Sequence, residues 1–140
     1  LHWIRPVVDA TKRTVRISAV LGLRSYGTFV GVAGCDLRVS SLAPKLRIDL
    51  PGFRRAYLVT EDGKIAVSEW LEASILAKVK NPDDALDLPP VDDPELGRRI
   101  SKGESGGYVK SGDRLLVFSR LSSPSWTYVA ELDKAQYFDD

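Results

Sequence analysis

Residue types that often carry chemistry are scarce in this 140-residue sequence, which has one cysteine, one histidine and no methionine. A single cysteine excludes an internal disulfide framework. The only histidine, His2, argues against histidine-based catalysis or a zinc site. No apolar run approaches the roughly 20 residues of a membrane helix. Because the chain begins with Leu1 and lacks Met, we expect it to be a processed or excised fragment.

Charge is distributed unevenly along the chain. Residues 1–57 carry ten Lys or Arg and three Asp or Glu, whereas residues 58–140 carry ten and sixteen. The basic residues of the first part are spread along predicted strands and a helix, with no dense run and no interleaved aromatics. We therefore interpret them as solvated faces and expect no nucleic-acid partner. The 44% apolar content is typical of a globular domain with its own core.

Alternating, β-branched segments predict strands in the N-terminal part. We expect strands at 13–23 and 28–37, joined at Tyr26-Gly27, with 3–8 as a candidate preceding strand. Residues 38–46 have helical spacing, although Pro44 strains the later turns. The exposed edges of this hairpin predict that it packs on the rest of the chain or pairs in a dimer.

The remainder predicts a second unit in which the helices lie between strands. AYLVTEDGKIAVS reads as strand, turn and strand from Ala56, and Asp93-Pro94 as a helix start. We expect, in order, this hairpin, a helix at 69–79, a loop at 81–95, a helix to Ile100, and strands at 107–110, 114–121 and 125–132. The fold class is thus α+β, a five-stranded antiparallel sheet with helices on one face, preceded by the N-terminal hairpin and a linking helix.

The order of several motifs resembles Cache-type, PAS-like sensor modules, the extracytoplasmic ligand-binding parts of bacterial receptors. GVAGCDL at 31–37 is similar to the family's strand end before a linking helix, YLVTEDGKI to the opening hairpin of the membrane-proximal unit, and the Trp126 strand to its closing one. The resemblance implies three parts: the last strands of a membrane-distal unit at 1–37, a linker at 38–55 and a proximal unit at 56–140. The distal unit's long N-terminal helix, and the part of its pocket with Arg, Trp and Tyr contacts, have no counterpart here.

Asp9 and Asp36 are the first candidate ligand-binding residues. By the resemblance, they fall where amino-acid-binding members hold the ligand's ammonium group, although Val7 replaces the Tyr expected two residues before Asp9. Carboxylates suit that task because charge-assisted hydrogen bonds to a cation are strong. Each also has a structural interpretation, Asp36 as the N-cap of the helix from Arg38 and Asp9 as a turn residue.

A second candidate pocket lies between the C-terminal sheet and the helical segment 69–105. The residues expected to line it are Tyr57, Trp70, Tyr108, Phe118 and Arg120. Arg120 shares strand parity with Phe118, so its guanidinium either clamps a ligand carboxylate or extends from the strand end into solvent.

No metal or cofactor is expected. The acidic stretch from Asp83 to Glu95 lacks the glycine and terminal glutamate of a calcium loop, so we interpret it as a solvated loop with helix-capping acids. Cys35 has no nearby histidine and is expected to be a small buried core thiol. The chain is therefore not expected to be an enzyme, and an acid–base pair of Asp9 and Asp36 is the only catalytic arrangement to weigh.

The favoured function is that of an extracytoplasmic, periplasmic small-molecule sensor in a transmembrane receptor of the histidine kinase, chemoreceptor or cyclase type. Its expected partners are an amino acid, carboxylate or amine ligand and a second copy in a homodimer, and its membrane contact is confined to helices outside the fragment. The alternative is a cytoplasmic PAS- or profilin-like dimerisation module without a ligand.

Overall fold

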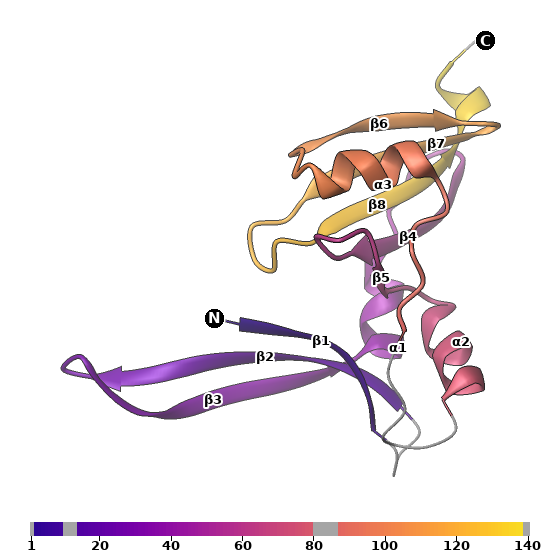
Figure 1. The fold of residues 1–140 in the computed structure, drawn as a ribbon. Helices are drawn as coiled ribbons and strands as arrows, with labels where there is room; N and C mark the ends of the chain where they lie inside the picture. Colours follow the sequence, from indigo (N-terminus) through magenta and orange to yellow (C-terminus); the bar gives the residue numbers. More distant parts are fainter. Residues whose placement is uncertain (1, 10–13, 80–86, 139–140) are drawn as a thin grey trace.

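Two antiparallel sheets, one small and one large, make up most of the structure, a computed structural model that describes residues 2–9, 14–79 and 87–138 (Figure 1). The first sheet contains β1 (His2–Asp9), β2 (Thr14–Ser25) and β3 (Thr28–Arg38) in that order. All three N-terminal strands expected from the sequence are therefore present. The long β2–β3 hairpin extends well beyond the rest of the molecule.

Strand β2 divides its residues between a packed face and an open face. Val15 and Ile17 are buried, whereas Arg16 and Ser18, which alternate with them, face the other side. Further along the hairpin the apolar side chains lose this cover. Exposed apolar residues there are Leu21, Leu23, Tyr26, Phe29, Val30 and Val32.

The linker forms a shorter α-helix than its spacing predicts. Helix α1 covers only Val39–Leu42, and a 3₁₀ turn, η1, follows at Ala43–Leu46. Pro44 explains the change because it has no N–H to donate within an α-helix. The expected N-cap role of Asp36 is wrong: the N-cap is Arg38, in extended conformation and without a side-chain cap.

The second sheet has five strands in the order β5-β4-β8-β7-β6, which confirms the predicted α+β fold class. Its strands are β4 (Phe53–Val59), β5 (Ile65–Val67), β6 (Gly106–Ser111), β7 (Arg114–Arg120) and β8 (Thr127–Asp133), followed by the short 3₁₀ turn η2 (Lys134–Gln136). Each neighbouring pair is antiparallel.

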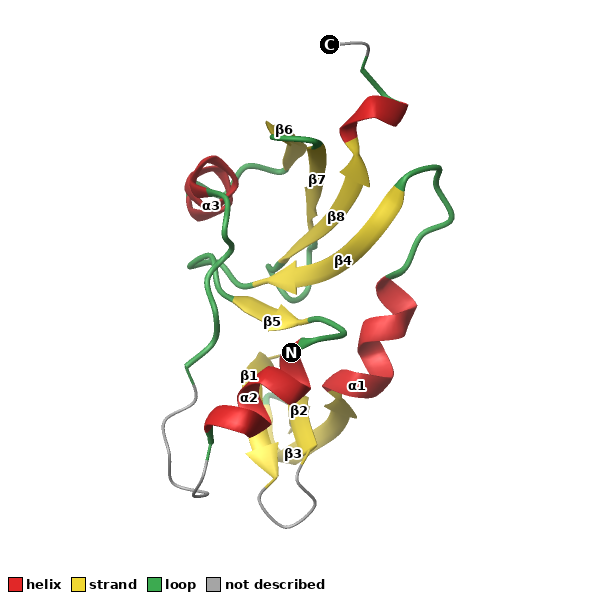
Figure 2. Cartoon of the chain, turned by 90° about the vertical axis from the view of Figure 1, so that its right-hand side faces the viewer, coloured by secondary structure: helices red, strands yellow, loops and turns green. Residues whose placement is uncertain are grey.

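Helix α3 (Pro94–Ser101) covers one face of the five-stranded sheet (Figures 1 and 2). It begins as predicted, because the Asp93 side chain accepts a hydrogen bond from the Leu96 N–H at 2.9 Å. Its buried residues, Leu96 and Ile100, share a core with Tyr57 of β4 and Phe118 of β7 on this face.

Helix α2 (Leu71–Lys78) joins the two sheets instead of covering the same face as α3. Its buried residues, Leu71 and Ile75, belong to one apolar core with Val15 and Ile17 of β2, and this core also contains Trp126. The N-terminal sheet thus packs on the rest of the chain, one of the two outcomes expected from its exposed edges. Among the described residues, every helix is too short or too polar to cross a bilayer.

Candidate functional site

Three charged side chains from three neighbouring strands meet on the open face of the N-terminal sheet. Nη1 of Arg16, on the central strand, lies 3.0 Å from Oδ2 of Asp36 and 3.9 Å from Oδ2 of Asp9. Ser18 Oγ donates a hydrogen bond to the other oxygen of Asp36. The register explains the meeting, since Asp36 lies opposite Ser18 and Asp9 lies opposite Thr14. Sequence separations of 7 and 20 residues thus become one cluster.

The cluster lines a cavity of about 420 Å³ that carries charges of both signs. Its lining residues are Asp9, Thr14, Arg16, Asp36 and Arg38. The two acids and two bases form a surface complementary to a ligand that carries both charges. The buried Nε of Arg16 donates no hydrogen bond within the described structure, so the cavity retains an unused donor.

A glutamate of α2 connects Arg38 and strand β2 to the core behind the cavity. Arg38 lies opposite Arg16 in the register, and its Nη2 is 3.8 Å from Oε1 of Glu72 on α2. The other carboxylate oxygen of Glu72 accepts a hydrogen bond from the Val15 N–H at 3.2 Å. A single glutamate therefore connects one wall of the cavity to the helix that packs between the sheets.

The predicted pocket between the C-terminal sheet and residues 69–105 is largely filled by the protein itself. Tyr57 and Phe118, two of its predicted lining residues, are buried in a core with Leu96 and Ile100 of α3. The guanidinium of Arg99 lies 4.9 Å from the Phe118 ring and donates a hydrogen bond to the Tyr108 carbonyl oxygen. Helix α3 was expected to form the roof of a hollow, and its side chains instead occupy that space.

The other predicted residues of this pocket do not converge on it. Tyr108 is 52% exposed on the opposite face of the sheet, because its neighbour Val109 is the residue of β6 that points into the core. The Tyr108 ring contacts Phe138. Arg120 is at the exposed end of β7 and donates to the Gly103 carbonyl oxygen at 3.1 Å, in keeping with the strand-end interpretation. Only Trp70 lies close to Tyr57, at 5.5 Å between ring centroids.

Sequence reasoning missed a buried ionic cluster beside Trp70. The Glu131 side chain is 2% exposed, and its two oxygens lie 2.8 Å from Arg114 Nη1 and 2.9 Å from Arg55 Nε. Burial, and then the Glu131 charge, raise the pKa of Tyr57. The available signal was an acid within the apolar run of β8, at the same parity as the buried Val129.

The environment of Cys35 differs from the one predicted. Cys35 is exposed, so its assignment as a buried core thiol is wrong. It lies on β3 opposite Ala19, where the hairpin has begun to leave the packed core.

Of the acidic stretch, Asp83 and Asp84 fall outside the described residues, Asp93 caps α3 and Glu95 pairs with Arg98. The residues that the structure describes contain no group of three or more potential metal ligands.

No family model matches the chain. Solved structures do, and they confirm the resemblance to Cache-type sensor modules. The ligand-binding domain of the Pseudomonas fluorescens chemoreceptor CtaA, in complex with L-alanine, is 26% identical with a TM-score of 0.59, and the match covers 99% of this chain and 56% of that one. The corresponding domain of the Pseudomonas aeruginosa chemoreceptor PctB, in complex with L-Gln, is 21% identical with a TM-score of 0.59, covering 99% and 53%.

A third similar structure comes from another class of receptor. The extracellular domain of the histidine kinase mmHK1S-Z2 is 17% identical with a TM-score of 0.62, and the match covers 96% of this chain and 51% of that one. The chain therefore spans about half the length of the domains that it matches. Its fold is that of extracellular ligand-binding sensor domains.

Proposed function

We propose that this chain is part of the extracytoplasmic sensor of a bacterial transmembrane receptor, and that the cavity of Asp9, Arg16 and Asp36 recognises a small amino acid. The observation that carries the proposal is the presence of both charges in that cavity, two carboxylates beside two guanidinium groups. A zwitterionic amino acid presents an ammonium group and a carboxylate on adjacent atoms, which is the complementary arrangement. The amino-acid complexes of CtaA and PctB support the same ligand class.

Each end of such a ligand has a defined partner. The ammonium group would donate to Asp9 and Asp36, as the resemblance to amino-acid-binding Cache modules implies. The ligand carboxylate would accept from Arg16, whose Nε is an unused buried donor, and from Arg38 on the neighbouring strand. Ligand binding would then replace part of the internal pairing between Arg16 and Asp36.

The proposed organisation follows the topology of the two sheets. Strands β1, β2 and β3 form an antiparallel meander with the same order as β6, β7 and β8. We therefore assign residues 1–37 to the last strands of a distal PAS-like unit, 38–55 to the linker and 56–140 to the proximal unit. The receptor would function as a homodimer anchored in the inner membrane, which light scattering of the purified chain and of the whole receptor can test.

Isothermal titration calorimetry tests the ligand assignment. L-Alanine should bind, whereas N-acetyl-L-alanine, which lacks the ammonium group, and L-alaninamide, which lacks the carboxylate, should each bind much more weakly. Asp36→Asn should weaken L-alanine binding by about 10- to 100-fold, since a hydrogen bond to a charged group contributes roughly 1.5–3 kcal/mol.

Asp49→Asn is the matched control, because Asp49 is exposed in the linker and does not line the cavity. It should leave the affinity unchanged. Equal binding of L-alanine and its N-acetyl derivative, or equal effects of the two substitutions, would refute the proposed recognition. Folding of each variant is checked by circular dichroism.

A further inference from the structure

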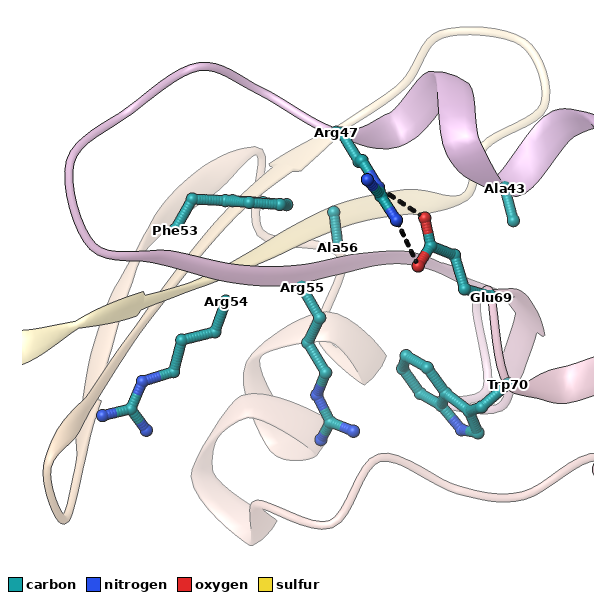
Figure 3. Close-up of a pocket in the computed structure, with 8 residues that line it drawn as sticks. All are labelled: Ala43, Arg47, Phe53, Arg54, Arg55, Ala56, Glu69 and Trp70. Carbon is teal, nitrogen blue, oxygen red and sulfur yellow. Dashed lines mark hydrogen bonds and ion pairs between the residues drawn. The ribbon is translucent and has the colours of Figure 1, made fainter.

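A second cavity, separate from the proposed amino-acid site, lies along strand β4 of the five-stranded sheet (Figure 3). It exists because β5 pairs with β4 only at Leu58 and Val59, so the earlier part of β4 has no partner strand on that side among the described residues. The cavity has a volume of about 280 Å³. It is lined by Ala43, Arg47, Phe53, Arg54, Arg55, Ala56, Glu69 and Trp70.

The lining combines excess positive charge with two aromatic side chains, which lie on opposite sides of β4 (Figure 3). Three arginines and one glutamate contribute the charged groups, and Phe53 and Trp70 contribute the rings. Arg47 is already engaged, because its Nε and Nη2 donate to the two oxygens of Glu69 at 2.6 and 3.0 Å. Arg54 directs Nη2 toward Asp113 and Asp133, at 3.1 and 3.3 Å.

Arg55 differs from the other two arginines because the protein contacts its guanidinium through Nε and one ring face. Its Nε lies 2.9 Å from the buried Glu131 carboxylate, and its guanidinium carbon lies 4.4 Å from the Trp70 ring centroid. Within the described part of the chain, its two Nη groups donate no hydrogen bond, and 41% of the side chain is exposed. The guanidinium is thus oriented in advance, with its outer donors available.

We propose that this cavity binds a small organic monocarboxylate with a flat apolar body. Its carboxylate would accept two hydrogen bonds from the Nη groups of Arg55, the geometry in which guanidinium and carboxylate match best. The apolar body would pack against the Trp70 ring, which lies on the same side of β4 as Arg55 (Figure 3). Of the three arginines that line the cavity, only Arg55 has outer donors that are not already directed at a carboxylate of the described residues, and one such fork matches a ligand with a single carboxylate.

Benzoate is the probe for this site, with acetate and benzamide as its two matched partners. In the whole chain at constant ionic strength, titration followed by calorimetry and tryptophan fluorescence should show saturable benzoate binding. Acetate should bind more weakly because it lacks the ring, and benzamide should show no saturation because it lacks the charge. Chloride at the same concentration should not compete.

Arg55→Lys keeps a positive charge beside Glu131 but removes the fork, and we expect it to weaken benzoate binding at least tenfold. Arg98→Lys is the matched control, because Arg98 is an exposed arginine on α3 outside the cavity. It should leave benzoate binding unchanged. Should circular dichroism show that Arg55→Lys does not fold, Trp70→Leu replaces it. That variant should weaken benzoate binding more than acetate binding.

Three results would overturn the proposal: equal binding of benzoate and benzamide, competition by chloride at equal concentration, or benzoate binding unaffected in the folded Arg55 or Trp70 variant. Asp36→Asn separates this site from the amino-acid cavity, since the two share no lining residue. It should leave benzoate binding unchanged even where it abolishes the response to L-alanine.

Discussion

Replacing Ile17 by alanine should destabilise the protein by about 3 kcal/mol, because this side chain fastens the N-terminal sheet to the rest of the chain. Ile17 is 1% exposed and packs in one core with Leu71, Ile75 and Trp126. The substitution removes three carbon groups, worth about 2.4 kcal/mol at roughly 0.8 kcal/mol each. The cavity left behind adds to this loss, since the strands and α2 can close it only in part.

Leu21→Ala is the matched control on the same strand. Leu21 has the same parity as Ile17 but lies further along the hairpin, where it is 44% exposed. Its removal should cost less than about 0.5 kcal/mol, as is usual for surface substitutions.

Urea unfolding followed by tryptophan fluorescence measures both effects. The signal is well placed, because Trp3 of β1 and Trp126 before β8 lie 6.4 Å apart between ring centroids at this junction. A lower midpoint with an unchanged slope is expected for Ile17→Ala. Equal stability of the Ile17 and Leu21 variants would refute the packing of the N-terminal sheet on the rest of the chain.

Three further perturbations test individual contacts. Hydrogen bonds from Thr60 and then from Arg5 lower the pKa of Asp62. The ionised Asp62 therefore stabilises the fold above the usual pKa near 3.8, and this stabilisation is lost as the pH falls through the lowered pKa. Asp62→Asn should flatten the pH dependence of the unfolding free energy in that acidic window, and an unchanged profile would contradict this prediction. Gly52→Ala should lower the thermal unfolding temperature more than Gly27→Ala. Both glycines have positive φ, but a Cβ at Gly52 would lie 2.7 Å from Gln136 Cγ, whereas a Cβ at Gly27 would have no atom within 4 Å. Removing the cap of α3 by Asp93→Ala should cost about 1 kcal/mol in urea unfolding, and a loss below 0.3 kcal/mol would show that the cap does not hold the helix.

The local signals of the sequence predicted most elements because they reflect short-range physics. The alternation of Val15 and Ile17 with polar residues identifies a half-buried strand, and Asp93-Pro94 identifies a helix start. Local signals predicted structure less well where strand pairing with a distant segment competes with them. Asp36 is a favourable N-cap residue, but pairing of β3 with β2 continues to Arg38 and keeps Asp36 inside the strand.

The candidate site was predictable in part, and the reason lies in sequence distance. The resemblance to Cache modules pointed to Asp9 and Asp36, but the position of Arg16 between them depends on the register of three strands. Likewise, no local pattern connects Arg55 with Glu131 across the sheet.

Pocket volume was the least predictable property. Tyr57 and Phe118 have the residue types of a ligand pocket, yet whether they line a hollow depends on how deeply α3 inserts Leu96 and Ile100. Because aromatic side chains serve cores and pockets equally well, composition alone does not separate the two.

An NMR titration with L-alanine tests whether the face of β1, β2 and β3 that carries Asp9, Arg16 and Asp36 recognises a zwitterionic amino acid. In ¹H–¹⁵N spectra of the whole chain, the amide signals of these three residues and of Arg38 should shift in a saturable manner with a single dissociation constant. Signals around Arg55 and Trp70 should stay in place. Shifts confined to the β4 cavity, or no saturable shift on the N-terminal sheet, would show that this face does not bind the amino acid.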